Sequence, residues 1–202
     1  LASWEGRLLV APPHEVILTT DASVTGWGAW LSTAALPEQP VATTFGHWSP
    51  HEADHSSNWR ETKTSLLALL AFRPQLEGKS ILLRTDNVAN MANIMRGGGR
   101  TRDLTSLAKA IWQTLWTWGC TLRATHRPGD TNELADSLSR QPLDSADWML
   151  HPALFREVSN RWGPFDVDLF ATRLNHQVPR FFSRFPDPEA WATDAFLQNW
   201  GP

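Results

Sequence analysis

The sequence predicts an α/β fold in which helices flank a mixed five-stranded sheet over residues 15–140. Three strand-like runs follow one another between turn-rich breaks, a pattern typical of an antiparallel three-strand meander. Two further apolar runs each follow a helix-like segment, so these two strands can join the sheet in parallel. The chain has 202 residues, of which 42% are hydrophobic. This is enough to bury the core of one such domain and too apolar for a disordered chain.

Five segments carry the β-branched and apolar residues that favour strands. They are residues 15–21, 26–31, 41–45, 80–85 and 121–125. Before the first strand, Pro12 and Pro13 discourage regular structure, so residues 1–14 are expected to form an irregular lead-in.

Four segments within the same region have the apolar spacing of helices. They cover residues 58 to about 73, 88–96, 103–118 and 132–140. Asp103 is the expected N-cap of the third, and Gly97 and Gly119 are expected to end the second and the third. Beyond a polar linker, residues 141–147, a helix is expected over 152–162 and a strand over 165–170. Residues 141–202 alone are too few for an independent core.

Composition narrows the functional class. The single cysteine, Cys120, excludes an internal disulfide and a Cys-rich zinc module. No apolar run approaches the roughly 20 residues of a membrane span, and no basic-then-apolar leader opens the sequence. We therefore expect an intracellular protein, cytoplasmic or nuclear, without membrane contact or disulfide partner. The net charge is −3, which does not by itself indicate nucleic-acid binding, although Arg accounts for 15 of the 18 basic residues.

Four carboxylates stand where secondary structure changes: Asp21, Glu61, Asp86 and Asp136. If the first and fourth strands are adjacent, Asp21 and Asp86 lie side by side, and helices packed over that edge can add Glu61 and Asp136. Such a group of like charges calls for a cation, and oxygen-only ligands select Mg²⁺ or Mn²⁺. Two such ions about 4 Å apart can activate water and stabilise the leaving oxygen of a phosphodiester. The pattern predicts a nuclease.

Four segments together carry a family resemblance. They are Thr20-Asp21-Ala22-Ser23, Asn58-Trp59-Arg60-Glu61, Arg84-Thr85-Asp86-Asn87 and residues 126–140, which read His-x-Pro-Gly-x-x-Asn-x-x-Ala-Asp-x-x-Ser-Arg. In this order they resemble the Asp-Glu-Asp-Asp signature of the ribonuclease H domains of retroelement polyproteins. The last segment is similar to the retrotransposon version. Asp86-Asn87, followed by a short helix and Gly-Gly, resembles the DIRS and Ngaro branch.

The resemblance implies a ribonuclease H-like fold for residues 15–140, preceded by a lead-in (residues 1–14) from an upstream polymerase. It implies that Asp21, Glu61, Asp86 and Asp136 hold two Mg²⁺ ions, with Mn²⁺ possible, and that His126 assists proton transfer or product release. The expected reaction is endonucleolytic hydrolysis of the RNA strand of an RNA:DNA hybrid during reverse transcription. The expected partners are that hybrid and the upstream reverse transcriptase domain of the same polyprotein.

The resemblance also suggests substrate contacts. Asn58 is expected to touch the minor groove of the hybrid, and backbone groups near Ala22 and Ser23, with Glu61, to read the 2′-hydroxyl. The segment 87–102 has no room for a separate basic substrate-binding helix, and its arginines are expected to contact phosphates instead. The predicted substrate-binding residues are Ala22, Ser23, Asn58, Asn87, Arg96, Arg100, Arg102 and Asn132.

Several alternatives remain at this point. The chain could be a catalytically silent nucleic-acid-binding or scaffolding module, or a related nuclease that cuts DNA. Glu61 could serve only as the capping-box partner of Asn58, three residues before it. His51-Glu52-Ala53-Asp54-His55 matches the zincin pattern, but its flanks lack helical periodicity, so a polar loop is expected. Residues 162–201 weakly resemble the leading part of phage-type DNA adenine methyltransferases, without the catalytic Asn/Asp-Pro-Pro-aromatic motif.

Overall fold

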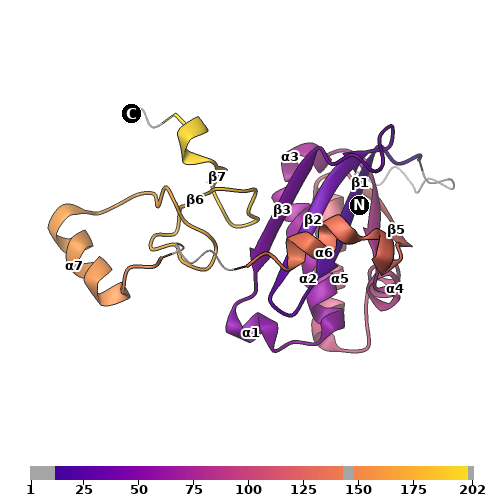
Figure 1. Ribbon diagram of the computed structural model, residues 1–202, viewed down its shortest axis with the longest axis horizontal. Coiled ribbons are helices and arrows are strands. Elements are labelled where there is room, and N and C mark those ends of the chain that lie inside the picture. The colour runs from indigo at the N-terminus through magenta and orange to yellow at the C-terminus, as the bar shows by residue number, and fades with distance from the viewer. Residues whose placement is uncertain (1–11, 143–147, 200–202) are drawn as a thin grey trace, which may run out of the picture.

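The computed structural model describes residues 12–142 and 148–199, and a five-stranded sheet lies at its centre (Figure 1). The strand order is β3-β2-β1-β4-β5. The strands are β1 (Val16–Ala22), β2 (Gly26–Thr33), β3 (Ala42–His47), β4 (Ser80–Thr85) and β5 (Thr121–His126). The first three form the antiparallel meander, and β4 and β5 pair in parallel with β1 and with each other. The predicted mixed sheet is confirmed.

Helices cover both faces of this sheet. The helices are α1 (Pro50–Ala53), α2 (Ser57–Ala71), α3 (Arg73–Leu76), α4 (Val88–Arg96), α5 (Arg102–Thr117) and α6 (Glu133–Ser139), with a 3₁₀ turn η1 (Gly129–Thr131) before α6. In Figure 1, α2 and α5 lie behind the sheet and α6 crosses in front of β1 and β2. The main core lies between the sheet and α2 with α5, where Leu18, Leu69, Leu83 and Ile111 are fully buried. The four helices predicted within residues 15–140 are all present.

Two helix ends differ from the prediction, both at N-caps. Helix α5 is capped by Thr101, whose hydroxyl accepts a hydrogen bond from the Leu104 backbone N–H at 3.3 Å. Asp103 is therefore not the cap. It is the second helical residue, where its negative charge still favours the helix dipole. Helix α2 is capped by Ser56, two residues before Asn58.

The C-terminal segment contains little regular structure. Helix α7 (Pro152–Trp162) has the predicted bounds, followed by β6 (Phe182–Ser183), β7 (Ala192–Thr193) and the 3₁₀ turn η2 (Ala195–Leu197). The strand predicted over residues 165–170 is wrong: only Asp168 pairs, in an isolated bridge to Phe181. Its carboxylate accepts the backbone N–H groups of Phe170 and Gln177 instead, which turns the chain away from an extended path.

Part of this segment packs on the edge strand of the sheet. Thr44 on β3 donates a hydrogen bond to the Pro186 carbonyl, and the rings of Phe45 and Phe185 lie 5.0 Å apart. Helix α7 buries none of its residues and extends away from the sheet (Figure 1). The lead-in predicted for residues 1–14 and the linker 141–147 fall mainly outside the described residues. Within the described part of the chain, no helix has both the length and the apolar character that crossing a bilayer requires.

Candidate metal centre at the ends of β1 and β4

The register of the sheet places two carboxylates next to each other. Strands β1 and β4 are parallel neighbours, and Thr20 pairs with Thr85. Asp21 and Asp86 each follow one of these paired residues, so both lie at the same edge of the sheet. Helix α2 packs over β1 and carries Glu61 to the same place. One carboxylate oxygen from each of the three residues lies within 4.8 Å of the others, so three of the four predicted ligands are brought together.

Glu61 is the most buried of these acids, at 4% exposed. Since Ser56 caps α2, Glu61 is the fifth helical residue and does not cap its own helix, so the capping-box alternative is wrong. Within the described residues, its Oε2 atom is buried without a hydrogen-bond partner. Burial raises the pKa of Glu61 to about 9, helped by the charges of Asp21 and Asp86 and opposed by the Ala22 backbone N–H and by Arg60.

Asp21 is also buried, but it has a specific partner. The hydroxyl of Ser139 on α6 donates a hydrogen bond to Asp21 Oδ2 at 2.7 Å. Burial, together with the charges of Asp86 and Asp136, raises the pKa of Asp21, although the bond from Ser139 acts in the opposite direction. Burial and the charge of Asp136 likewise raise the pKa of Asp86, against the effect of its own backbone N–H and of His126. All three acids therefore resist ionising together.

These three residues fit a hard divalent cation. The donor set contains only carboxylate oxygens, which suit Mg²⁺ or Mn²⁺ rather than softer metals. A buried carboxylate oxygen without a partner is costly, and a cation would both satisfy Glu61 Oε2 and offset the mutual repulsion.

Asp136, the fourth predicted ligand, lies beside this group and not within it. Its Oδ1 atom accepts hydrogen bonds at 2.7 Å from the guanidinium of Arg140, one helical turn later on the surface of α6. The side chain of Asp136 is 42% exposed. It is still close enough for its charge to raise the pKa of Asp21 and Asp86.

The approach of α6 to the site depends on a glycine. Gly28 on β2 pairs with Asp21, and a Cβ atom added there would lie 2.5 Å from the Ser139 backbone nitrogen and 2.7 Å from the Ala135 carbonyl oxygen. No β-carbon fits in such a gap. The absence of a side chain at Gly28 therefore lets α6 lie on the sheet and bring Ser139 to Asp21.

His126 ends β5 opposite Thr85. Its Nε2 atom lies 3.0 Å from the Asp86 carbonyl oxygen, which places the ring at the rim of the acidic group, exposed to solvent. It also lines an open hollow of about 670 Å³ on the sheet face next to α6, together with the Arg84 and Arg127 side chains. Both arginines are ion-paired with Glu38.

Two predicted substrate residues form a pair at the rim. The side-chain amide of Asn87 donates to Asn58 Oδ1 at 3.1 Å, joining the start of α4 to the start of α2. Asn87 also caps α4 through its side-chain oxygen Oδ1, which accepts the Asn90 backbone N–H at 2.9 Å. Asn58 is exposed and Asn87 partly so, which leaves the pair accessible next to Glu61 and Asp86.

Three other predicted substrate residues lie inside the protein or are already engaged. Asn132 is 2% exposed and donates to the Thr20 carbonyl at 3.3 Å, so it fastens the start of α6 to β1. The buried hydroxyl of Ser23 donates to the Ser139 carbonyl at 2.6 Å. The backbone N–H of Ala22 is directed at the Glu61 carboxylate. These contacts hold the acidic group in place, and the substrate contacts of these three residues stay a prediction.

The remaining predicted substrate residues, Arg96, Arg100 and Arg102, are exposed around the loop between α4 and α5. In the part of the chain that the structure describes, none of them belongs to an ion pair. Their phosphate contacts stay a prediction.

Sequence reasoning missed Asn90 and Ser139. Asn90 is fully buried, and its amide donates to Ser65 Oγ at 3.1 Å and to Thr85 Oγ1 at 3.3 Å, which connects α4 with α2 and β4 under the acids. A signal for Ser139 was present, because it belongs to the Ser-Arg end of the last motif. No local signal distinguished Asn90.

The zincin-like segment proves to be structural. Residues 50–53 form the single turn α1 instead of the expected loop, because Ser49 and Glu52 make a capping box around Pro50. Glu52 is ion-paired with Arg173, and the ring of His55 stacks on Trp59 at 3.9 Å. The glutamate and one imidazole of the motif are therefore committed to other contacts.

A mixed sheet of this order, with carboxylates from two parallel strand ends and a helix meeting at one edge, defines a ribonuclease H-like protein. Solved structures agree in fold. RNase H1 from the archaeon Halobacterium salinarum NRC-1 matches at TM-score 0.52 and 20% identity, covering 65% of this chain and 97% of its own. An N-terminal RNase H domain from Mycobacterium tuberculosis matches at TM-score 0.51 and 18% identity, covering 62% and 91%.

The family is shown by sequence. Residues 11–112 match the family described as the RNase H-like domain found in reverse transcriptase, and the chain belongs to that family. The matched region contains Asp21, Glu61 and Asp86 and ends before His126 and Asp136. The protease-reverse transcriptase of prototype foamy virus is a more distant structural match, at TM-score 0.48 and 16% identity, covering 69% of this chain and 18% of its own. A search of curated protein sequences returned no match.

Proposed function

We propose that this chain is a metal-dependent endonuclease that hydrolyses the RNA strand of RNA:DNA hybrids. The observation that supports this most directly is Glu61 Oε2, which is buried without a hydrogen-bond partner in the described structure while oxygens of Asp21 and Asp86 lie within 4.8 Å of the Glu61 carboxylate. A protein that only binds nucleic acid gains nothing from this concentration of uncompensated charge.

In the proposed mechanism, Asp21, Glu61 and Asp86 would hold Mg²⁺, with Mn²⁺ as a substitute. Bound divalent ions supply a water nucleophile at neutral pH and stabilise the charge of the leaving oxygen. Asp136 adds negative charge at the open side of the group. Helix α2 and Ser139 keep Glu61 and Asp21 in position, so little rearrangement is required when substrate arrives.

His126 is the residue proposed to transfer a proton. Its Nε2 atom contacts a carbonyl oxygen, which can only accept, so Nε2 carries the hydrogen. In the neutral ring, Nδ1 is then free to take up a proton from the reacting centre or from product.

The Asn58 and Asn87 pair is the proposed contact with the minor groove, where a 2′-hydroxyl distinguishes RNA from DNA. Arg96, Arg100 and Arg102 would contact phosphates on the neighbouring surface, with an affinity that falls as salt concentration rises.

We further propose that the domain derives from a retrotransposon polyprotein of the DIRS and Ngaro branch and acts together with an upstream reverse transcriptase domain. The support is the sequence of residues 126–140 and the short segment 87–102 that replaces a basic helix. Residues 15–140 form the proposed catalytic domain, and residues 141–202 an appendix to it.

The test is a cleavage assay on the full chain with Mg²⁺, using matched RNA:DNA hybrid, duplex DNA and duplex RNA. We expect cutting of the hybrid alone, in its RNA strand, abolished by EDTA and by Asp86→Asn. Asp166→Asn, which removes an exposed carboxylate on the C-terminal segment, is the matched control and should cut normally. Cutting of duplex DNA would indicate the related DNA nuclease. Hybrid binding without any cutting would indicate a silent module and overturn the proposal.

A further inference from the structure

Arg173, in the C-terminal segment, forms an ion pair with Glu52 on α1, the short helix that precedes α2. Its guanidinium contacts both oxygens of Glu52, at 2.8 Å and 3.2 Å, and also donates to the His47 carbonyl at 2.7 Å. The side chain of Arg173 is 8% exposed and that of Glu52 is 13% exposed. Exposed ion pairs are often incidental, whereas a bidentate pair this buried constrains both partners and the chain that carries them.

The contact favours the charged form of Glu52. Burial alone would raise the pKa of Glu52, but Arg173 and the Ser49 backbone N–H outweigh it and leave the pKa below its ordinary value. On the other side, the carboxylate of Asp187 accepts the Arg173 backbone N–H at 3.2 Å and so holds the segment from which the arginine extends.

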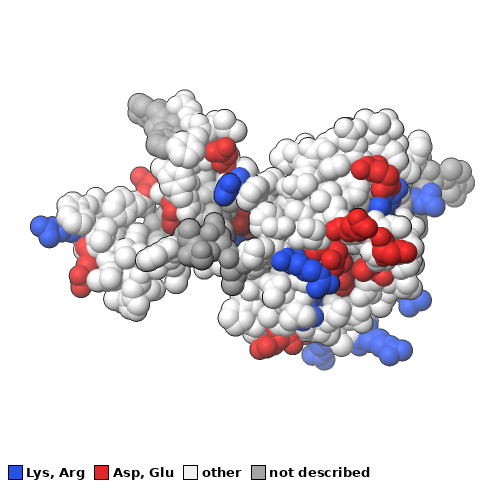
Figure 2. Space-filling view, viewed as in Figure 1, with Lys and Arg blue, Asp and Glu red and all other residues white. Residues whose placement is uncertain are grey.

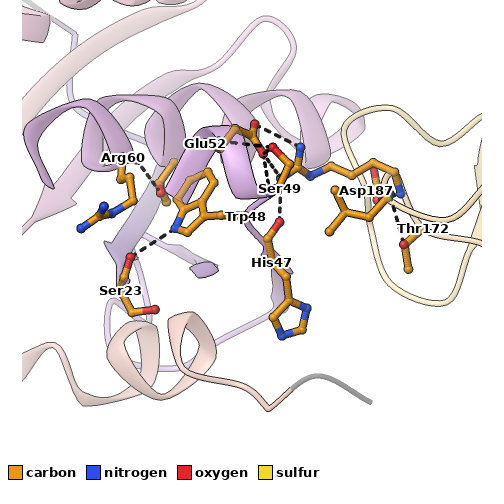
Figure 3. A network of polar contacts seen from close by, with 11 residues as sticks. Ser23, His47, Trp48, Ser49, Glu52, Arg60, Thr172 and Asp187 are labelled. Atoms are coloured by element: carbon orange, nitrogen blue, oxygen red, sulfur yellow. Dashed lines mark hydrogen bonds and ion pairs between the residues drawn. The ribbon is translucent and has the colours of Figure 1, made fainter. Parts of the chain in front are cut away.

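The pair is part of the cap of α1. Glu52 Oε2, the atom nearest Arg173, also accepts the backbone N–H and the hydroxyl of Ser49, each at 3.0 Å (Figure 3). Helix α1 has four residues and buries none of them. Such a turn has almost no packing of its own, so polar contacts decide where it lies.

From α1 the contacts continue to Glu61. Arg60, the preceding residue on α2, donates to the carbonyls of Ala53 and His55 at 2.8 Å and 2.7 Å. The end of α1 and the first turns of α2 are thus fastened together immediately before Glu61.

A second route leads to Asp21. His47, whose carbonyl accepts from Arg173, precedes Trp48, and the buried indole N–H of Trp48 donates to the Ser23 carbonyl at 3.2 Å (Figure 3). Ser23 lies two residues after Asp21 and, through its hydroxyl, contacts the same Ser139 that donates to Asp21.

We propose that Arg173 is a positioning residue for the metal centre: by clamping Glu52 and His47, the C-terminal segment fixes residues 47–56 and thereby the place of Glu61 relative to Asp21. The inference rests on the proposed function for its consequence in catalysis, but the geometry of the ion site is a separate measurable property. The inference also gives the part of residues 141–202 that carries Arg173 a role in positioning the metal centre.

The test compares full-chain wild type with Arg173→Ala, Arg173→Lys and a control, Arg180→Ala. Arg180 is exposed on the same segment and stacks on Trp191. Three properties are measured well below the unfolding temperature. They are Mg²⁺ binding by calorimetry, kcat and KM on hybrid, and amide hydrogen exchange over residues 49–61. We expect Arg173→Ala to weaken Mg²⁺ binding and lower kcat, each about tenfold, with KM within twofold of wild type and faster exchange. The lysine variant should recover part of both losses, and the control should match wild type.

Wild-type Mg²⁺ affinity and kcat in Arg173→Ala, whatever its thermal stability, would overturn the inference. If Arg173→Ala does not fold, Arg173→Lys and Glu52→Gln carry the same comparison, and unchanged Mg²⁺ affinity in both is the overturning result. A wild type that binds Mg²⁺ without cutting hybrid would defeat the proposed function alone, since the effect of Arg173 on ion binding still decides this inference. A wild type that binds no divalent ion defeats both.

Discussion

Ser139 on α6 donates a buried 2.7 Å hydrogen bond to Asp21 on β1, across 118 residues of sequence. The oxygen of the same hydroxyl lies 2.9 Å from the Asp136 carbonyl oxygen, and the Ser139 carbonyl accepts a hydrogen bond from Ser23. The last helix of the domain is thereby connected to the first strand at the acidic group. A hydrogen bond to a carboxylate stabilises its charged form, so Ser139 favours the ionised Asp21 that a metal requires.

Ser139→Ala should therefore raise the pKa of Asp21 further. We expect Mg²⁺ affinity at pH 7 to fall about threefold to tenfold, an effect of about 1 kcal/mol, which is the typical net contribution of one hydrogen bond. Ser137→Ala, an exposed serine on the same helix, is the control in calorimetry at pH 7 and should bind Mg²⁺ like wild type. Wild-type affinity in Ser139→Ala would contradict this reasoning.

Glu61 makes the metal-free protein sensitive to pH. Its pKa is about 9 in the folded chain against an ordinary value of 4.5. Between these values the unfolded chain is ionised while the folded chain keeps its proton, so stability is full below pH 4.5 and is lost as pH rises toward 9. At 1.36 kcal/mol per unit, the loss by pH 7 is at most about 3 kcal/mol.

Glu61→Gln should remove this loss. Urea unfolding in EDTA is expected to show the variant more stable than wild type at pH 8 and similar to it at pH 4.5, with little Mg²⁺ binding. Glu157→Gln, exposed on α7, should leave the pH dependence unchanged. For wild type, Mg²⁺ affinity should rise with pH up to about 9, because the ion displaces the proton of Glu61. A pH-independent affinity would contradict the raised pKa.

Asp86 and Asp136 should differ as ligands. Asp86 shares the 4.8 Å group with Asp21 and Glu61, whereas Asp136 is paired with Arg140 on the surface of α6 (Figure 2 shows acidic and basic side chains gathered on the face that carries this helix). We expect Asp86→Asn to weaken Mg²⁺ binding more than tenfold and Asp136→Asn less than threefold, measured by calorimetry. Equal losses would place Asp136 among the ligands of the first ion.

Gly28→Ala should displace α6. The added methyl group would meet the backbone of Ser139 and Ala135 at less than 3 Å, and overpacking of this kind costs about 1–3 kcal/mol. Both stability in urea and Mg²⁺ affinity should fall. Gly98→Ala is the control, because a β-carbon there meets Thr105 at an ordinary 3.5 Å. A stable variant with intact ion binding would show that α6 does not position Asp21.

Much of the fold could be predicted from local pattern. Runs of β-branched and apolar residues marked all five strands, and helical spacing ended by Gly97, which adopts a left-handed conformation, marked α4 and its end. The strand predicted over residues 165–170 is absent because a strand needs a neighbouring strand to pair with. An apolar run in the sequence does not reveal whether such a neighbour exists. The N-cap of α5 is Thr101 and not the predicted Asp103. Either residue type can serve as an N-cap, and only the backbone geometry decides between them.

By itself, the sequence determined the order of elements around Asp21, Glu61 and Asp86, since residues at the ends of neighbouring parallel strands must meet at one edge. The tertiary structure alone decided that Glu61 is buried with an unpartnered oxygen, that Asp136 turns to Arg140, and that Arg173 reaches Glu52 across 121 residues. Burial and long-range pairing depend on how whole elements pack. Short stretches of sequence determine the individual helices and strands. They do not determine which distant residues come into contact when these elements pack.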